Sequence, residues 1–201
     1  MDAEFPLRTE EDLARAMPRH LIALGRADVL AADWVSRVRD AVAAGGPALP
    51  RYPMSPVMEE TLFEVRRAGR VVRGLEDVET ALAKEEAGLS RAAATRTQSG
   101  HPRISRLLIV SADGSERFYR QVDQVKRRYA HRLEALLVEG DEFDLGGAVF
   151  GSGKRARAVL LDQKDAVIHF LESAGLIPPE EAAEADGEEI SPVDAERSDV
   201  E

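Results

Sequence analysis

Residues 104–115 read ISRLLIVSADGS, and this stretch decides the fold class. Its centre, residues 107–110, is a run of four aliphatic residues with no polar residue between them. Such a run is typical of a strand that is buried on both faces of a sheet. The Ala-Asp-Gly-Ser that follows is rich in turn-forming residues, so we expect the strand to end there. A strand buried on both faces needs helices on both sides of its sheet, and the stretch therefore predicts an α/β domain.

Strands and helices alternate on either side of this stretch. Each further strand is expected where a short apolar run lies between turn residues, at 70–74, 133–138 and 156–161. Helices are expected where apolar residues recur at three- or four-residue spacing, at 55–69, 75–87, 141–150 and 166–174 and in the segment that holds Phe118, Val122 and Val125. The alternation indicates right-handed crossovers and a largely parallel sheet within residues 55–175. We expect this span to fold without the rest of the chain.

Residues 1–50 are predicted to be a helical appendage. Thr9 is a suitable N-cap, because three acidic residues follow it in what would be the first helical turn. Pro18 is expected to kink or split this helix. A second helix, from about Asp28 to Gly45, has one apolar side formed by Leu30, Trp34, Val38 and Val42. Four prolines within residues 47–56 indicate a linker to the α/β domain.

Charge is distributed unevenly along the chain, whose formal net charge is −10. Residues 179–201 hold ten acidic residues and one arginine, a net of −9, so residues 1–178 carry −1. We expect this acidic tail to be disordered, because it has little apolar surface to bury. Residues 66–132 carry 15 Lys and Arg against 8 Asp and Glu, a local +7. This surplus permits a polyanionic partner, and an ordinary solvated surface is the simpler explanation.

Several classes of function are excluded or lack support. The chain has no cysteine, which excludes disulfides, thiolate catalysis and cysteine-based zinc sites. Its four histidines are dispersed, with no pair at metal-ligand spacing, and no Ser/His/Asp set is visible. We therefore expect no catalytic residue, no metal site and no cofactor. The sequence shows no signal peptide and no apolar run that could span a bilayer, so we expect a cytoplasmic protein with no membrane partner.

Three basic segments are candidate anion-binding sites. The first is a cluster formed by Arg66, Arg67, Arg70 and Arg73. It lies at the end of one predicted helix and close to the start of the next, where guanidinium and backbone N–H groups suit a phosphate, although cations at a helix C-terminus explain it equally well. Residues 91–106 add four arginines, for which a plain surface insertion is the simpler interpretation. Residues 151–155, Gly-Ser-Gly-Lys-Arg, lack the full phosphate-loop pattern and are better interpreted as a tight basic turn.

Three further segments carry a family resemblance. They are residues 67–74 (RAGRVVRG), 107–113 (LLIVSAD) and 144–151 (DLGGAVFG). In this order they resemble the Arg-Ala-Gly-Lys-x-x-x-Gly junction, the strand ending in Ala-Asp and the Leu-Gly-x-Ala-x-Gly helix of the kink-turn RNA-binding ribosomal-protein superfamily, the ribosomal L-seven-Ae / L-thirty-e group. Its bacterial ribosome-associated members are the most similar. The resemblance implies a three-layer α-β-α sandwich with a four-stranded mixed sheet.

The resemblance also implies where RNA would bind. In the family, a Gly-x-Asn-Glu-x-x-Lys stretch opens the second helix and reads sheared G·A pairs, and here residues 74–80 read GLEDVET. The glycine matches and an acid remains at Asp77, whereas Glu76 replaces the asparagine and Thr80 replaces the lysine. These departures remove a donor to base edges and a phosphate contact. The RNA-binding residues that the resemblance implies are Arg70, Arg73, Gly74, Glu76, Asp77 and Thr80.

We therefore expect a non-catalytic RNA-binding or ribosome-associated protein, whose partner is structured RNA or the ribosome. The alternative is a protein–protein interaction module that kept the fold and lost kink-turn recognition. The departures at Glu76 and Thr80 and the acidic tail favour this alternative, and the N-terminal helices are where a protein partner would bind. An enzyme acting on RNA would need a catalytic set that the sequence does not show.

Overall fold

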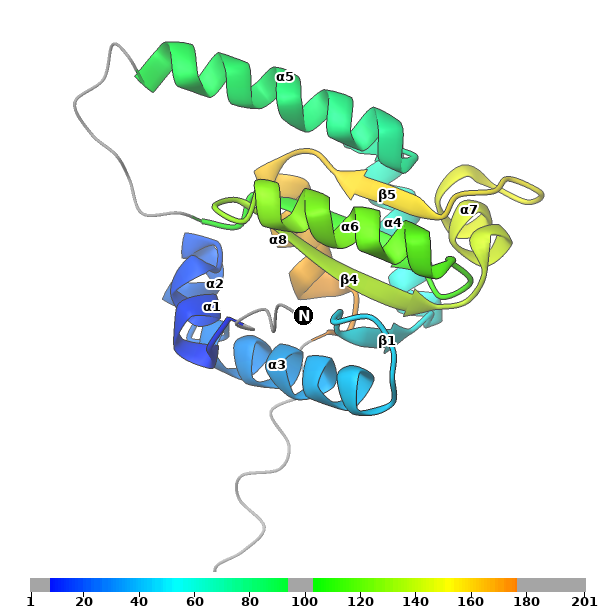
Figure 1. Ribbon diagram of the computed structural model, residues 1–201, viewed down its shortest axis with the longest axis horizontal. Helices are drawn as coiled ribbons and strands as arrows, with labels where there is room; N and C mark the ends of the chain where they lie inside the picture. Colours follow the sequence, from blue (N-terminus) through cyan, green and yellow to red (C-terminus); the bar gives the residue numbers. More distant parts are fainter. Residues whose placement is uncertain (1–7, 94–102, 177–201) are drawn as a thin grey trace, which may run out of the picture.

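The computed structural model describes residues 8–93 and 103–176 (Figure 1). These residues form eight helices and five strands: α1 (Glu10–Ala16), α2 (Arg19–Ala23), α3 (Ala27–Ala43), β1 (Arg51–Pro53), α4 (Pro56–Arg67), β2 (Val71–Arg73), α5 (Leu75–Ala93), β3 (Arg106–Ser111), α6 (Glu116–Arg128), β4 (Leu133–Glu139), α7 (Glu142–Phe150), β5 (Ala158–Leu161) and α8 (Lys164–Ser173). The predicted acidic tail at 179–201 lies outside the described residues. Within them, no helix is long and apolar enough to cross a membrane.

The strands of the described residues form one mixed sheet in the order β1-β4-β3-β5-β2. β4 is parallel to β1 and to β3, whereas β5 is antiparallel to β3 and to β2. The sheet thus has five strands where the resemblance implied four, and it is mixed, as the resemblance implied, because β5 runs against the other four strands. The additional strand is β1, which lies within the predicted linker. β3 lies between β4 and β5, which explains its unbroken apolar run.

Helices cover both faces of the sheet (Figure 1). On one face, α5 and α6 bury Val78, Leu82, Val122 and Val125 against β3, β4 and β5. On the other face, α4, α7, α8 and the N-terminal helices bury a second, larger set of apolar side chains. The α/β class predicted from the sequence is confirmed. α5 is longer than expected, since it continues beyond residue 87 to Ala93.

The N-terminal helices share their core with the sheet. Leu21 of α2 and Leu30 and Trp34 of α3 belong to the same buried cluster as Leu136 and Val138 of β4. The predicted break at Pro18 is present, because α1 ends at Ala16 and α2 begins at Arg19. Val42, predicted to lie on the buried side of α3, is 48% exposed. The N-terminal segment is therefore integrated with the α/β domain, and this shared core argues against independent folding of residues 55–175.

Tyr52 ties β1 to α3. Its hydroxyl donates to Asp33 Oδ2 at 2.7 Å, and the guanidinium of Arg37, which donates to the same carboxylate, lies 4.3 Å from the centre of the Tyr52 ring. Arg37 also donates to the carbonyl of Arg51 at 3.0 Å. Burial, together with the Asp33 hydrogen bond, raises the pKa of Tyr52 well above its ordinary value. These contacts explain why a proline-rich segment forms an edge strand here.

Candidate nucleic-acid interface

The chain turns sharply twice between α4 and α5. Gly69 follows α4 with a φ of +69°, and Gly74 precedes α5 with a φ of +84°, conformations that glycine adopts at little steric cost. Between these turns β2 pairs with β5, and the N–H of Gly74 donates to the carbonyl of Ala158 at 2.8 Å. The two turns place Arg70, Arg73 and Gly74 at the edge of the sheet, directly before the start of α5.

A hollow of about 430 Å³ opens at the start of α5. Its lining combines the end of β2 and the first turn of α5 with one face of α6: Arg73, Gly74, Leu75, Glu76, Asp77, Glu79, Phe118 and Gln121. Four of the six residues that the resemblance implied therefore line one hollow, and Arg70 and Thr80 do not. Phe118 and Gln121 were not predicted as site residues, because only the packing of α5 and α6 on the same sheet face brings them there.

Arginine and phenylalanine side chains alternate beside this hollow. The guanidinium of Arg73 lies 5.1 Å from the centre of the Phe150 ring, and that of Arg66 lies 5.9 Å from it. The guanidinium of Arg155 lies 5.1 Å from the centre of the Phe143 ring, and Arg73 donates a hydrogen bond to the Arg155 carbonyl. We call Arg66, Arg73, Phe143, Phe150 and Arg155 the Arg–Phe cluster. A guanidinium stacked on a ring keeps the N–H groups on its edge directed outward, where they suit a phosphate.

Residues 151–155 form a turn, as predicted, but its position beside β2 could not be read from the sequence. The turn connects α7 to β5 and brings Arg155 next to Arg73. Glu142, the first residue of α7, pairs with Arg155 and lies 3.4 Å from Nε of Arg157. Its hydrogen bond and charge raise the pKa of the Arg155 guanidinium. One carboxylate thus holds two cations of this segment against α7.

Arg70 and Thr80 have local partners. The carbonyl of Arg70 accepts from the N–H of Asp162 at 3.2 Å, which brings an acidic side chain close to this arginine. Burial raises the pKa of the Asp162 carboxyl, and the charges of Arg106 and Arg70 offset part of that rise. The hydroxyl of Thr80 donates to the carbonyl of Glu76 at 3.0 Å on the exposed surface of α5. Arg70 therefore carries a partly compensated charge.

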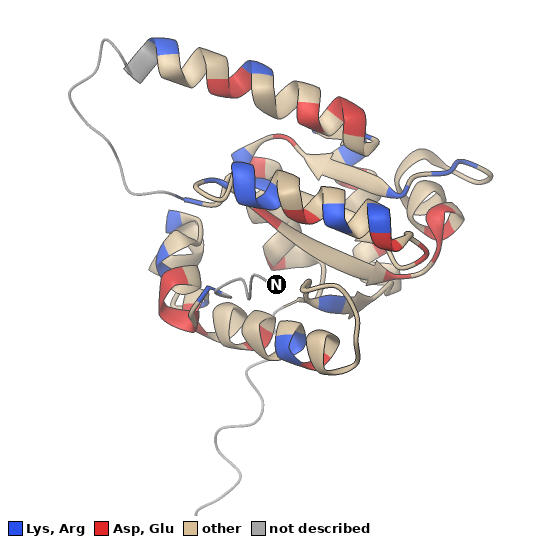
Figure 2. Cartoon of the chain, in the orientation of Figure 1, with Lys and Arg blue, Asp and Glu red and all other residues tan. Residues whose placement is uncertain are grey.

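The charges that line the hollow are mainly negative. Glu76, Asp77 and Glu79 oppose a single lining cation, Arg73. Figure 2 shows the same contrast on a larger scale, with acidic residues along α5 and basic residues towards both ends of α6. Carboxylates in the first turn complement the helix dipole and accept hydrogen bonds from base N–H groups, although they repel phosphates. The surface thus offers acceptors at the helix start and donors in the adjoining Arg–Phe cluster.

No family model and no curated protein matches the chain. Among solved structures, the chain is similar to that of a protein with unknown function from Bacillus halodurans C, with 19% sequence identity and a TM-score of 0.42 over 61% of this chain and 98% of that chain. So distant a likeness supports no inference about function. In the part of the chain that the structure describes, no three His, Asp or Glu side chains come together to hold a metal ion.

Proposed function

We propose that this protein is a non-catalytic RNA-binding or ribosome-associated module that contacts structured RNA at the start of α5. The observation that carries the proposal is the Arg–Phe cluster beside a hollow lined by helix-start carboxylates. As part of this proposal, the fold is the three-layer α-β-α sandwich of the family. Its four strands would be β2, β3, β4 and β5, and β1 would be an addition. It also includes a cytoplasmic location and RNA as the partner.

The side chains of this surface divide into two chemical roles. Arg73 and Arg155 present guanidinium groups that suit phosphates, and the ring of Phe118, which lines the hollow, offers apolar area on which an unpaired base could stack. Glu76 and Asp77 accept hydrogen bonds, so a base that presents N–H groups on its edge would be preferred there. With Thr80 at the position of the family's lysine, we expect modest affinity that depends mainly on phosphate contacts.

The test is a titration of a kink-turn RNA and an unkinked control RNA at two salt concentrations. Replacing Arg70 and Arg73 together by Ala should weaken binding of both RNAs and flatten the salt dependence, because fewer counterions are released. Thr80→Lys should tighten binding several-fold by adding a cation at the helix surface. The matched control replaces Arg15 and Arg39, exposed arginines of α1 and α3, by Ala and should leave binding unchanged. If the Arg70/Arg73 variant and Thr80→Lys both bind RNA with the affinity of the wild type, this surface is ruled out.

The second candidate function is a protein–protein interaction module. It is favoured by the three carboxylates that face a single arginine in the hollow, since this balance opposes a polyphosphate backbone. A partner with a basic segment would suit these carboxylates. If the protein binds neither RNA at low salt, this candidate takes the lead, and replacement of Glu76 and Glu79 by Gln should then weaken capture of a basic peptide.

A further inference from the structure

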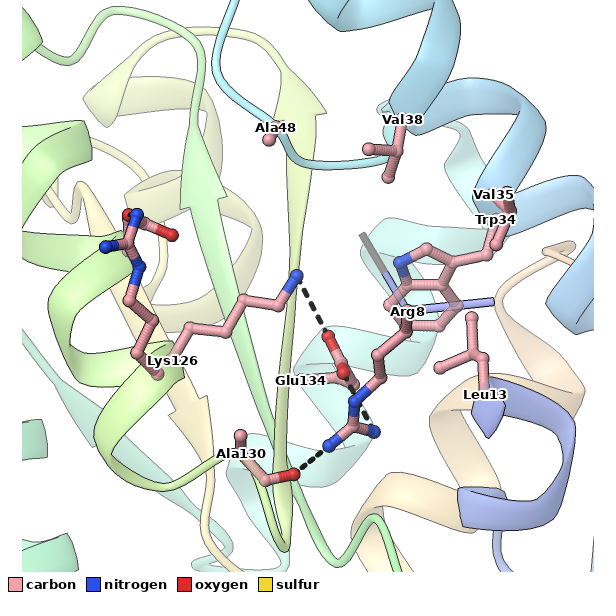
Figure 3. Close-up of a pocket in the computed structure, with 11 residues that line it drawn as sticks. Arg8, Leu13, Trp34, Val35, Val38, Ala48, Lys126, Ala130 and Glu134 are labelled. Atoms are coloured by element: carbon pink, nitrogen blue, oxygen red, sulfur yellow. Dashed lines mark hydrogen bonds and ion pairs between the residues drawn. The ribbon is translucent and has the colours of Figure 1, made fainter. Parts of the chain in front are cut away.

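A second region of interest lies at the other edge of the sheet, where β1 covers only the end of β4. β1 pairs with Leu137, Val138 and Glu139, so within the described residues positions 133–136 of β4 have no strand partner on that side. α1 and α3 approach this stretch from one side and α6 from the other. They leave a cavity of about 240 Å³ between them (Figure 3). The cavity shares no lining residue with the hollow at α5.

A buried carboxylate forms the polar side of this cavity. Glu134 of β4 is 2% exposed, and its two oxygens face two cations. Arg8 Nη1 lies 3.1 Å from Glu134 Oε1, and Lys126 Nζ lies 3.1 Å from Glu134 Oε2. Arg8 also donates to the carbonyl of Ala130 (Figure 3). Because a buried acid needs compensation, Glu134 holds both cations at the wall of the cavity.

The cavity nevertheless has more donors than acceptors. Arg8 Nη1 is close enough to Glu134 for an ion pair, yet it is a buried nitrogen without an aligned hydrogen-bond acceptor. Among the charged lining residues Arg127 pairs with Asp123, so two cations, Arg8 and Lys126, face the single carboxylate of Glu134. The unpartnered Arg8 nitrogen and this one-charge surplus favour an anionic acceptor.

The remaining wall is apolar and sets the shape of an occupant. Leu13 of α1 and Trp34, Val35 and Val38 of α3 line this side, and the Trp34 indole supplies a flat surface. A cavity of roughly 150 Å³ is enough to hold benzene, so 240 Å³ accommodates one aromatic ring together with a small polar substituent. An apolar body packed on Trp34 would leave its charged group beside Arg8 and Lys126.

We propose that this cavity is a binding site for a small aromatic carboxylate. The ring packs between Trp34 and Val38, and the carboxylate accepts hydrogen bonds from Arg8 and Lys126 on the side away from Glu134. The proposal stands independently of RNA binding, because it rests on different residues at a different edge of the sheet.

The experiment compares benzoate with two probes of nearly the same shape, neutral benzamide and cationic benzylamine. The chain has one tryptophan, so its fluorescence reports on Trp34 alone. Benzoate should change this emission saturably, with a dissociation constant of about 1 mM or tighter. Benzamide should bind about tenfold more weakly or worse, because it forfeits the charge-assisted hydrogen bonds, and benzylamine should not bind. Calorimetric titration of the full chain checks the same ranking without fluorescence.

Two variants on one helix locate the site. Val38→Phe places a ring in the cavity and should abolish the benzoate response, whereas Val29→Phe, at a position on α3 that is 47% exposed, should leave it unchanged. If Val38→Phe fails to fold, the order of affinity of the three probes for the unmodified chain still tests the proposal. The proposal is overturned by any of three results: no saturation by benzoate up to about 10 mM, equal binding of benzamide, or stronger binding of benzylamine.

Discussion

The cavity at β4 and the hollow at α5 use the same residue types in opposite ways. At the cavity, Glu134 is almost completely buried and each of its oxygens faces a cation. At the hollow, Glu76, Asp77 and Glu79 are exposed, and Arg73 stacks on a ring instead of pairing with them. A buried charge is tied to its neighbours because water cannot replace them, whereas an exposed charge is screened and can exchange partners.

This difference separates charges that the fold depends on from charges that it does not. Removing one member of a buried ion pair leaves an uncompensated charge and destabilises the fold, typically by roughly 3–5 kcal/mol. Removing an exposed charge changes stability by about 0.5 kcal/mol or less, so its main effect is on a partner. Loss of a charge at the cavity should therefore lower stability as well as ligand binding, whereas loss of a charge at the hollow should change binding with little effect on stability.

The largest expected effect is the loss of cooperative folding when residues 1–54 are deleted. The deletion removes α1, α2, α3 and β1, and it exposes Leu136, Val138 and Ile104, which are now buried with Trp34 and Leu30 in one cluster. We expect a fragment of residues 55–176 without a sharp thermal transition in circular dichroism. Adding the peptide 1–54 back should restore the transition, and a fragment that unfolds cooperatively on its own would instead show that the N-terminal helices are dispensable.

The second expected effect is destabilisation by Lys126→Met. The variant keeps the aliphatic length of the side chain and leaves Glu134 buried with Arg8 as its remaining partner. Because the Lys126 side chain is 23% exposed, we expect a loss of about 2 kcal/mol, below the range for a fully buried pair. Urea unfolding measures this loss. Lys154→Met, in the exposed turn after α7, is the matched control and should change stability by about 0.5 kcal/mol or less.

A double variant tests whether the charge is responsible. Glu134→Gln removes the buried charge, so combining it with Lys126→Met should cost less than the sum of the two single changes. Strict additivity would mean that Lys126 stabilises the protein through its packing alone.

The sequence predicts the elements that depend on local patterns and fails where distant segments meet. The run at 107–110 and the apolar spacing of α6 identify a buried strand and its covering helix, because each pattern is complete within one element. β1 could not be predicted, because a strand of three residues with a proline is held by Asp33 and Arg37 from another element. The core shared by the N-terminal helices and the sheet could not be predicted for the same reason, since apolar stripes do not reveal which face covers which.

The residues of the candidate site also fall into two groups, those that the sequence could identify and those that it could not. Arg73, Gly74, Glu76 and Asp77 are contiguous in sequence, so a motif could find them and the structure keeps them together. Phe150 and Arg155 reach the site only because β2 pairs with β5 and α7 precedes β5, and a sequence offers no sign of that adjacency. The same holds for Arg8 and Glu134, which are separated by most of the chain.

A third effect, comparable in size to that of Lys126→Met, is expected from glycine substitutions in α7, which positions the Arg155 turn. A Cβ added to Gly146 would lie 2.6 Å from the backbone N of Ala156 and would also meet the Lys154 carbonyl, so backbone must move. We expect Gly146→Ala to destabilise the protein by about 1–3 kcal/mol and to weaken RNA binding by displacing Arg155. A Cβ on Gly147 meets nothing within 4 Å, so Gly147→Ala should be neutral or stabilising by about 0.5 kcal/mol. If Gly146→Ala and Gly147→Ala change the free energy of unfolding in urea equally, the close contact between Gly146 and the Arg155 turn does not contribute to stability.

The smallest expected effect is a change in pH dependence caused by Asp162→Asn. Burial raises the pKa of the Asp162 carboxyl in the folded protein above its ordinary value, so the unfolded chain loses this proton first as the pH rises. Within that window the folded state binds more protons, and the contribution of Asp162 to stability falls with increasing pH. Asp162→Asn removes this decline, so the free energies of unfolding of the variant and the wild type should diverge as the pH rises from about 3 to 7, in favour of the variant. The substitution also removes an acid near Arg70 and should tighten RNA binding slightly if Arg70 contacts phosphate. Parallel stability curves would show that the pKa of Asp162 is the same in the folded and the unfolded chain.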